Sequence, residues 1–303
     1  MTTKMTQQRT DLALEAAEKI FSGGGATKNI PGAVTRERFL QGCRVTDVAI
    51  STPEAARCIG KPQGNYITVD LGPFCRREEN FFHRTALCLA GELRALLPGT
   101  GNKFPALVVG LGNRAMAADA VGPQALDYLL VTRHMVRSLP RQFAGFTPVA
   151  ALATGVLGRT GMDASELIGG AVAQVRPAAV IAIDALAARD KDRLCATVQL
   201  SDTGLIPGSG VGNHRRAVTA ESLGLPVIAV GVPTVIEAGT LCRELLHDAG
   251  QEKFDLGHRG DGLFVTLRDV DQRVRDLSRL LGYAVNMALQ PELTEEDITG
   301  LLG

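Results

Sequence analysis

The chain has 303 residues, of which 45% are hydrophobic, and its 32 lysines and arginines balance 32 aspartates and glutamates. This length suits one large or two small domains. The balanced charge and the lack of a basic block argue against nucleic-acid binding. No apolar run reaches the roughly 18 residues of a membrane-spanning helix.

The cysteines and the N-terminus indicate the compartment. Six cysteines are scattered without a Cys-x-x-Cys pair, which argues against a zinc ribbon or a thioredoxin-type motif and is typical of reduced, intracellular proteins. The first ten residues are polar and contain no apolar core, so no secretory signal is expected. We therefore expect a soluble cytoplasmic protein that contacts neither membrane nor nucleic acid directly.

The N-terminal part of the chain predicts a tail, a helix and two strands. Residues 1–11 are polar and indicate a loose tail. Residues 12–20 predict a short amphipathic helix that ends at a run of glycines. Residues 30–60 are irregular in pattern apart from a strand at 44–50. Residues 65–71 alternate apolar and polar side chains, which predicts a half-buried strand.

The rest of the chain alternates strands and helices. The expected strands are 105–111, 147–153, 178–184 and 226–232. The expected helices are 79–97, 119–138, 163–175 and 271–289. These strands lack polar alternation, so both of their faces should be covered. The pattern predicts a single α/β domain, a three-layer αβα arrangement on a mostly parallel sheet. Smaller β additions should come from residues 30–70, and residues 194–200 should add an edge strand.

Two aspartates follow strands of this sheet. Asp119 comes after the glycine turn Gly110-Leu111-Gly112-Asn113, and Asp184 ends the strand at 178–184. Because the carboxyl ends of parallel strands meet at one edge, we expect both carboxylates in one crevice. Such a pair, with one member protonated, can activate a water molecule. The predicted chemistry is amide hydrolysis without a covalent intermediate and without a cofactor.

Each aspartate also has a purely structural interpretation. Asp119 could cap the helix predicted to begin there, and Asp184 could be a surface turn residue. The glycine turn does not complete the dinucleotide-binding fingerprint, because the third glycine and the acidic ribose ligand are missing. A serine nucleophile is disfavoured because no Gly-x-Ser-x-Gly elbow occurs.

A long loop rich in glycine and serine covers residues 201–216. Its part at 207–213 could line the cleft and supply backbone N–H groups to an oxyanion. The equally simple interpretation is a flexible connector. His214 follows directly and would then be a solvated loop residue.

Several short segments together resemble the spore germination protease family. They are Arg9-Thr10-Asp11-Leu12-Ala13, Gly60-Lys61-Pro62, Gly110-Leu111-Gly112-Asn113, Asp119-Ala120-Val121-Gly122-Pro123, Thr160-Gly161-Met162, 182–189, 207–213 and 231–235. The resemblance covers nearly the whole chain, and the order and number of the segments make it specific. It implies an aspartic-type endopeptidase whose two aspartates fall on Asp119 and Asp184.

The resemblance also implies how such a protein is made and used. Its substrates would be the small acid-soluble proteins that protect spore DNA, and it would work in the forespore or spore core. It would be an inactive zymogen, assemble as a homotetramer and trim its own N-terminus. The cut would fall between Asp11 and Leu12, where an acidic residue precedes a large apolar one. Residues 1–11 would then be a propeptide and 12–303 the peptidase domain.

The same family is similar to the hydrogenase maturation endopeptidases, which recognise nickel through carboxylates and a histidine. Asp119 and Asp184 would fall on two of those ligand positions, and no histidine is assigned to the third. A metal-dependent peptidase that acts on one partner protein is therefore the alternative function. A non-enzymatic binding module on the same fold is a third.

Overall fold

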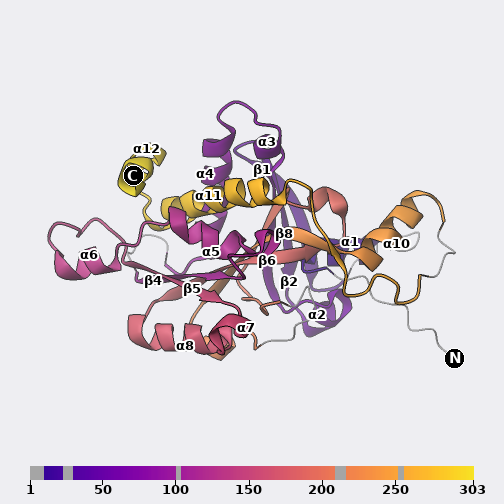
Figure 1. Ribbon diagram of the computed structural model, residues 1–303, viewed down its shortest axis with the longest axis horizontal. Helices are drawn as coiled ribbons and strands as arrows, with labels where there is room; N and C mark the ends of the chain where they lie inside the picture. Colours follow the sequence, from indigo (N-terminus) through magenta and orange to yellow (C-terminus); the bar gives the residue numbers. More distant parts are fainter. Residues whose placement is uncertain (1–9, 23–29, 100–103, 209–215, 252–255) are drawn as a thin grey trace.

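The computed structural model describes residues 10–22, 30–99, 104–208, 216–251 and 256–303. These residues form one nine-stranded sheet with the strand order β1-β2-β3-β7-β8-β6-β4-β5, and β9 pairs with β8 (Figure 1). The strands are β1 Ala33–Leu40, β2 Cys43–Ile50, β3 Gly64–Asp70, β4 Ala106–Leu111, β5 Val149–Gly155, β6 Ala179–Ala188, β7 Thr197–Ser201, β8 Val227–Glu237 and β9 Phe264–Val265.

Helices cover both faces of the sheet. They are α1 Ala13–Ser22, α2 Pro53–Ile59, α3 Gly72–Cys75, α4 Phe81–Leu96, α5 Val121–Ala125, α6 Arg133–Ser138, α7 Leu157–Thr160, α8 Ala164–Val175, α9 Ala220–Leu223, α10 Ala238–Asp248, α11 Val270–Leu289 and α12 Glu295–Leu302, with 3-10 turns η1 Ala117–Asp119, η2 Leu126–Tyr128 and η3 Lys191–Arg193. In Figure 1, α4, α5 and α11 lie on one side of the sheet and α7 and α8 on the other. The expected α/β class with three layers is confirmed.

The sheet has a parallel half and an antiparallel half. Strands β5, β4, β6 and β8 are parallel neighbours. Strands β1, β2 and β3 join this half through β7, and all of their pairings are antiparallel. The antiparallel part is therefore larger than the additions that the sequence predicts.

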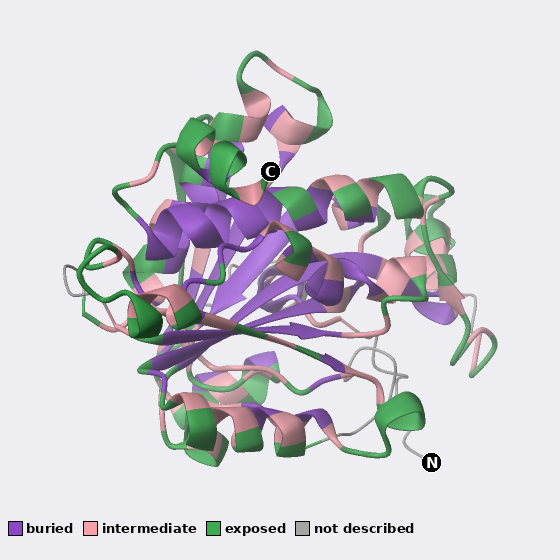
Figure 2. Cartoon of the chain, turned by 60° about the vertical axis from the view of Figure 1, so that its left-hand side comes forward, coloured by how far each residue is buried: buried purple, intermediate pink, exposed green. Residues whose placement is uncertain are grey.

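Successive residues of the central strands belong to two separate cores. On β4, Val108 packs in the cluster beneath α4, α5 and α11. Its neighbours Leu107 and Val109 pack with Ile168 of α8 on the opposite face. Figure 2 shows these buried strands between the two helix layers. The covered faces predicted from the lack of polar alternation are confirmed here, whereas residues 150–153 of the edge strand β5 alternate between half-buried and exposed.

The prediction that residues 30–60 are irregular outside one strand is wrong. They hold a complete hairpin, β1 with β2, and the helix α2. β1 is mostly exposed, so its side chains carry no apolar alternation that would reveal it. The ends of α2 do carry sequence signals: Thr52 caps it by accepting a bond from Ala55 N–H, and Gly60 ends it in the left-handed conformation.

The strand expected at the edge lies inside the sheet. β7 pairs with β3 on one side and with β8 on the other. Residues 66–69 of β3 are all buried, so β3 is not the half-buried strand that its alternation suggests. The reason is that a second layer covers its polar face, where Tyr66 packs with Ala13 of α1 and Ile59 of α2.

The continuous helix expected over residues 119–138 is also absent. The chain becomes extended at Leu129, between η2 and α6. There the N–H of Leu130 donates to Oδ1 of Asn286 on α11, at 2.9 Å. This distant partner satisfies a backbone group that a helix would otherwise satisfy. In the described part of the chain, no helix is long and apolar enough to cross a membrane.

Candidate active site

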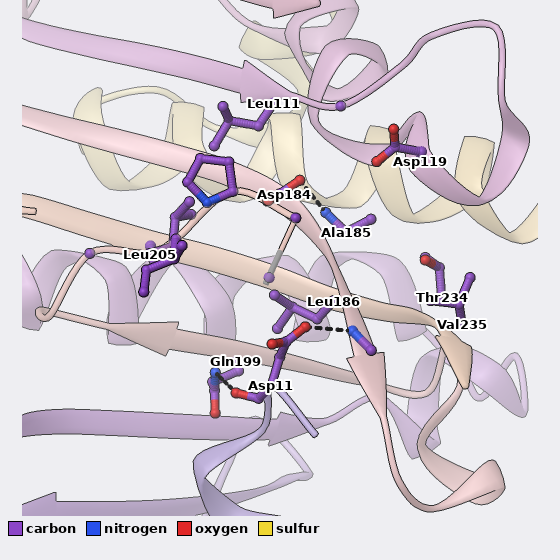
Figure 3. A pocket seen from close by; sticks show the side chains of 18 of the residues that line it. Asp11, Leu111, Asp119, Asp184, Ala185, Leu186, Gln199, Leu205, Thr234 and Val235 are labelled. Atoms are coloured by element: carbon purple, nitrogen blue, oxygen red, sulfur yellow. Dashed lines mark hydrogen bonds between the residues drawn. The ribbon is translucent and has the colours of Figure 1, made fainter. Parts of the chain in front are cut away.

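A cavity of about 850 Å³ lies at the carboxyl end of the parallel strands. The ends of β4, β5, β6 and β8 contribute to its wall, as does the chain before α1. Asp119 and Asp184 both line this cavity, and so does Asp11 (Figure 3). The structure therefore brings the predicted water-activating pair and the predicted trimming site to one place.

Asp184 lies within β6, which continues to Ala188. It is only 6% exposed, and its Oδ1 accepts a bond from the N–H of Ala185 at 2.9 Å. The interpretation as a surface turn residue is therefore wrong. In the sheet, Asp184 is paired with Gly231 of β8, which is paired with Gln199 of β7. Because directly opposed residues point to the same face, Asp184 and Gln199 share a face with a glycine between them.

Leu186 fills the space over that glycine. A Cβ atom on Gly231 would come within 2.3 Å of Cδ1 of Leu186. Two strand spacings separate Asp184 from Gln199, which is roughly 10 Å. Figure 3 shows Leu186 between Asp184 and Asp11. The leucine thus divides the part of the cavity that holds Asp184 from the part that holds Asp11.

Asp119 is held in the turn that follows β4. Its Oδ2 accepts a bond from the N–H of Asn113 at 2.8 Å. Ala120 occupies the capping position of α5, so the interpretation of Asp119 as a helix cap is wrong. The hydroxyl of Thr234 on β8 donates to the carbonyl oxygen of Ala118 at 2.6 Å, which ties this turn to the sheet.

Glycines allow the Asp119 turn and α5 to approach the strands closely. Gly112 has φ +109°, and a Cβ there would be 2.1 Å from the carbonyl oxygen of Asp119. A Cβ on Gly110 would be 2.4 Å from the carbonyl oxygen of Gly122. A Cβ on Gly122 would in turn be 2.4 Å from the carbonyl oxygen of Ile183. The glycine turn is used for close packing, in keeping with the incomplete dinucleotide fingerprint.

The segment that holds Asp11 and Leu12 lies along the cavity wall. The N–H of Asp11 donates to the carbonyl oxygen of Ala187, and the N–H of Ala187 donates to Oδ2 of Asp11, both at 2.9 Å. The carbonyl oxygen of Asp11 accepts bonds from Nζ of Lys61 at 2.9 Å and from Nε2 of Gln199 at 3.3 Å. The side chain of Leu12 is fully buried. The peptide bond predicted to be cut is therefore fixed in place.

Lys61 is a site residue to which the sequence reasoning assigned no role. Besides Asp11, its ammonium donates to the carbonyl oxygen of Thr10 at 3.2 Å. Burial lowers the pKa of Lys61 because the ammonium loses hydration, and the charges of Asp11 and Glu15 oppose this shift. The glycine directly before Lys61 is a sequence signal for the end of a helix, and Gly60 does end α2 in the left-handed conformation. The structure was needed to show which way the lysine points.

The glycine-rich loop is described only in part. Pro207 and Gly208 line the cavity, whereas 209–213 and His214 lie outside the described residues. Within the described ranges, no three His, Cys, Asp or Glu side chains form a group that could hold a metal ion. The predicted roles of this loop and of a histidine ligand stay predictions.

Among solved structures, the chain is similar to the [NiFe] hydrogenase maturation protease HycI from Thermococcus kodakarensis KOD1. The identity is 16%, the TM-score is 0.35, and the match covers 64% of this chain and 99% of that one.

Similarity to known sequences extends over nearly the whole chain. A family model described as germination protease matches residues 10–253. The germination protease of Caldanaerobacter subterraneus subsp. tengcongensis is 38% identical, over 97% of this chain and 98% of that protein. The chain is also similar to the germination proteases of Clostridium perfringens (36% identical, over 98% of this chain and 100% of that protein) and Priestia megaterium (38% identical, over 96% and 76%). The chain belongs to the germination protease family and is thus a peptidase of spore germination.

Proposed function

We propose that the protein is an aspartic-type endopeptidase that begins the breakdown of the small acid-soluble, DNA-protecting proteins of the spore. It would act in the spore core as a homotetramer. Membership of the germination protease family supports proteolysis as the activity. One observation supports the mechanism: Asp119 and Asp184 line one cavity at the carboxyl end of the parallel strands.

The proposed chemistry uses the two carboxyl groups as a unit that shares one proton. The ionised carboxylate removes a proton from water, and the water oxygen attacks the carbonyl carbon of the peptide bond. The protonated partner donates to the carbonyl oxygen. The first carboxyl group then gives its proton to the amine nitrogen, its partner takes a proton from the diol intermediate, and the C–N bond breaks. Hydrolysis is complete without a covalent intermediate.

We further propose that the chain is a zymogen that trims itself between Asp11 and Leu12, with residues 1–11 as the propeptide. The bond lies in the cavity but apart from Asp184, because the Asp11 carbonyl is held by Gln199, whose strand lies two strand spacings, roughly 10 Å, from that of Asp184. Leu186 lies between Asp184 and Asp11. The segment must shift past Leu186 before it can be cut. This held position supports a latent precursor.

The position of the cut is directly measurable. Purified full-length chain, incubated and followed by intact mass and N-terminal sequencing, should yield a product that begins Leu12-Ala13-Leu14. The reason is that the contacts of Asp11 and Leu12 keep this bond in the cavity that Asp119 and Asp184 also line, so that the shift past Leu186 brings it to them. A mature chain that begins at another residue would contradict the assignment.

Replacement of Lys61 by methionine should accelerate self-trimming. Lys61 donates to two carbonyl groups of the held segment, and a hydrogen bond to a charged group contributes about 1.5–3 kcal/mol. Its loss should raise the trimming rate by about 10- to 100-fold, measured from the mass of the chain over time. Lys191→Met, an exposed lysine paired with Asp248, is the matched control. Slower trimming would instead mean that Lys61 polarises the carbonyl during the reaction.

The substrate proposal is tested with the trimmed protein. It should cut a small acid-soluble spore protein at few positions, each after an acidic residue, as judged by the masses of the fragments. Intact substrate after prolonged incubation would favour a binding module. Treatment with a chelator tests the metal-dependent alternative: activity that is lost and then restored by nickel would support it.

A further inference from the structure

Glu15 is a buried carboxylate in the first turn of α1. It is 0% exposed, and its oxygens accept bonds from the N–H groups of Arg189 at 2.7 Å and Asp190 at 3.0 Å. Nε of Arg193 lies 3.6 Å from Oε1 of Glu15. The pKa of Glu15 is raised because burial outweighs these contacts. An additional positive charge nearby would stabilise this carboxylate.

Thr10 links Glu15 to the bond proposed to be cut. Its hydroxyl group donates to Oε2 of Glu15 and accepts a bond from the N–H of Leu12 at 3.0 Å. The nitrogen of Leu12 and the carboxylate of Glu15 therefore contact the same oxygen atom. Two hydrogen-bond lengths place them within about 6 Å of each other. Thr10 is part of the segment that a cut between Asp11 and Leu12 would release.

The helix geometry allows a direct contact once Thr10 leaves. Leu12 precedes the first residue of α1, and its carbonyl oxygen accepts the bond from Ala16 N–H at 3.2 Å. Glu15 is then the third helical residue, the position from which a glutamate side chain reaches back to the capping N–H in a capping box. In the uncut chain the Thr10 hydroxyl is inserted between the two groups.

The cut would change the charge at this point. Hydrolysis leaves a carboxylate on Asp11 and an amine on Leu12, and the amine takes up a proton below a pH of about 8. The side chain of Leu12 is fully buried in a cluster with Ala188 and Ile236. The new ammonium would thus form next to a buried side chain and at the positive end of a helix dipole. A charge in that setting requires an anionic partner.

We infer that Glu15 becomes the partner of the Leu12 α-ammonium in the trimmed protein, an inference that rests on the proposed cut. The ion pair takes the place of the Thr10 hydroxyl and ties the new N-terminus to the backbone of residues 189–190. Lys61 is the competing cation, since it loses the carbonyl groups of Thr10 and Asp11 in the same step. Arg193 remains shared with Glu18.

The test avoids any dependence on self-cleavage. In the full chain, residues 8–11 are replaced by the recognition sequence of a site-specific protease that cuts after its last residue, so that cutting the folded protein leaves Leu12 first. Acylation of the Leu12 amine is then followed against pH by mass spectrometry of the N-terminal peptide. The midpoint should lie at least about one pH unit above the 7.7–8.0 of a free α-amine. Near pH 7, below both midpoints, labelling should be about tenfold slower than in Glu15→Gln.

Glu18→Gln is the matched control, because Glu18 lies on the same helix and contacts Arg193. It should leave the midpoint unchanged. Equal labelling of the wild-type and Glu15→Gln proteins would overturn the inference. If Glu15→Gln does not fold, the midpoint of the wild-type protein is sufficient. A midpoint of about 7.7–8.0 would overturn the pairing of Glu15 with the Leu12 ammonium and would favour Lys61 as the partner of Glu15. A raised midpoint in a protein that never trims itself would support the pairing while the proposed self-cleavage fails.

Discussion

Replacement of Asp184 by asparagine should lower peptide turnover by at least about a hundredfold, because a positioned general acid or base contributes 10²–10⁴ in rate. Asp119→Asn should have an effect of the same order. The double variant should be little worse than either single variant, since groups that act as a unit are not additive. The measurement is kcat/KM of the trimmed protein on a peptide with one cleavage site, together with the rate of self-trimming.

Asp127→Asn is the matched control for these variants. Asp127 lies on η2, close in sequence to Asp119, but pairs with Arg114 on the surface and is 46% exposed. Its turnover should equal that of the wild type. All three variants should keep the thermal midpoint of the wild type within a few degrees, because each only replaces one carboxylate oxygen by an amide NH2 group of similar size. An Asp184 or Asp119 variant that retains most of its turnover would remove that residue from the mechanism.

Gly122→Ala should have the largest effect on stability. A Cβ there would lie 2.4 Å from the carbonyl oxygens of both Ile183 and Leu111. Backbone atoms of two buried strands have no free space into which to move, so the cost should reach or exceed the roughly 3 kcal/mol of severe overpacking. The free energy of unfolding in urea measures it. Turnover should fall as well, because Ile183 directly precedes Asp184.

The control for this glycine lies on α8. Gly170 has nothing within 4 Å of the position of a Cβ atom. Because alanine has less backbone freedom to lose in a helix, Gly170→Ala should stabilise the protein by about 0.5–1 kcal/mol. If Gly122→Ala cost less than about 1 kcal/mol, the close approach of α5 to β4 and β6 would be contradicted.

The gathering of the three acidic residues shows how far sequence patterns reach. The sheet edge at which Asp119 and Asp184 line one cavity follows from two apolar strands that each lead into a polar residue. The interpretations of Asp119 as a helix cap and Asp184 as a turn residue were local, and tertiary contacts overturned both. Asp11 is bound by Lys61 and Gln199, which lie about 50 and 188 residues away from it in the chain. No periodicity within a window encodes such a meeting.

The amino-acid sequence by itself determined the α/β class, the covered parallel strands β4, β6 and β8, and the helices α4, α8 and α11. The reason is that burial leaves a pattern within each segment: a helix buried on one face has apolar residues at a regular spacing, and a strand covered on both faces has a continuous apolar run. Only the tertiary structure decided that β7 lies inside the sheet, that residues 119–138 do not form one continuous helix and that Lys61 binds the Asp11 carbonyl. Those outcomes depend on hydrogen bonds between distant segments, in which each backbone group takes whichever partner the fold brings to it.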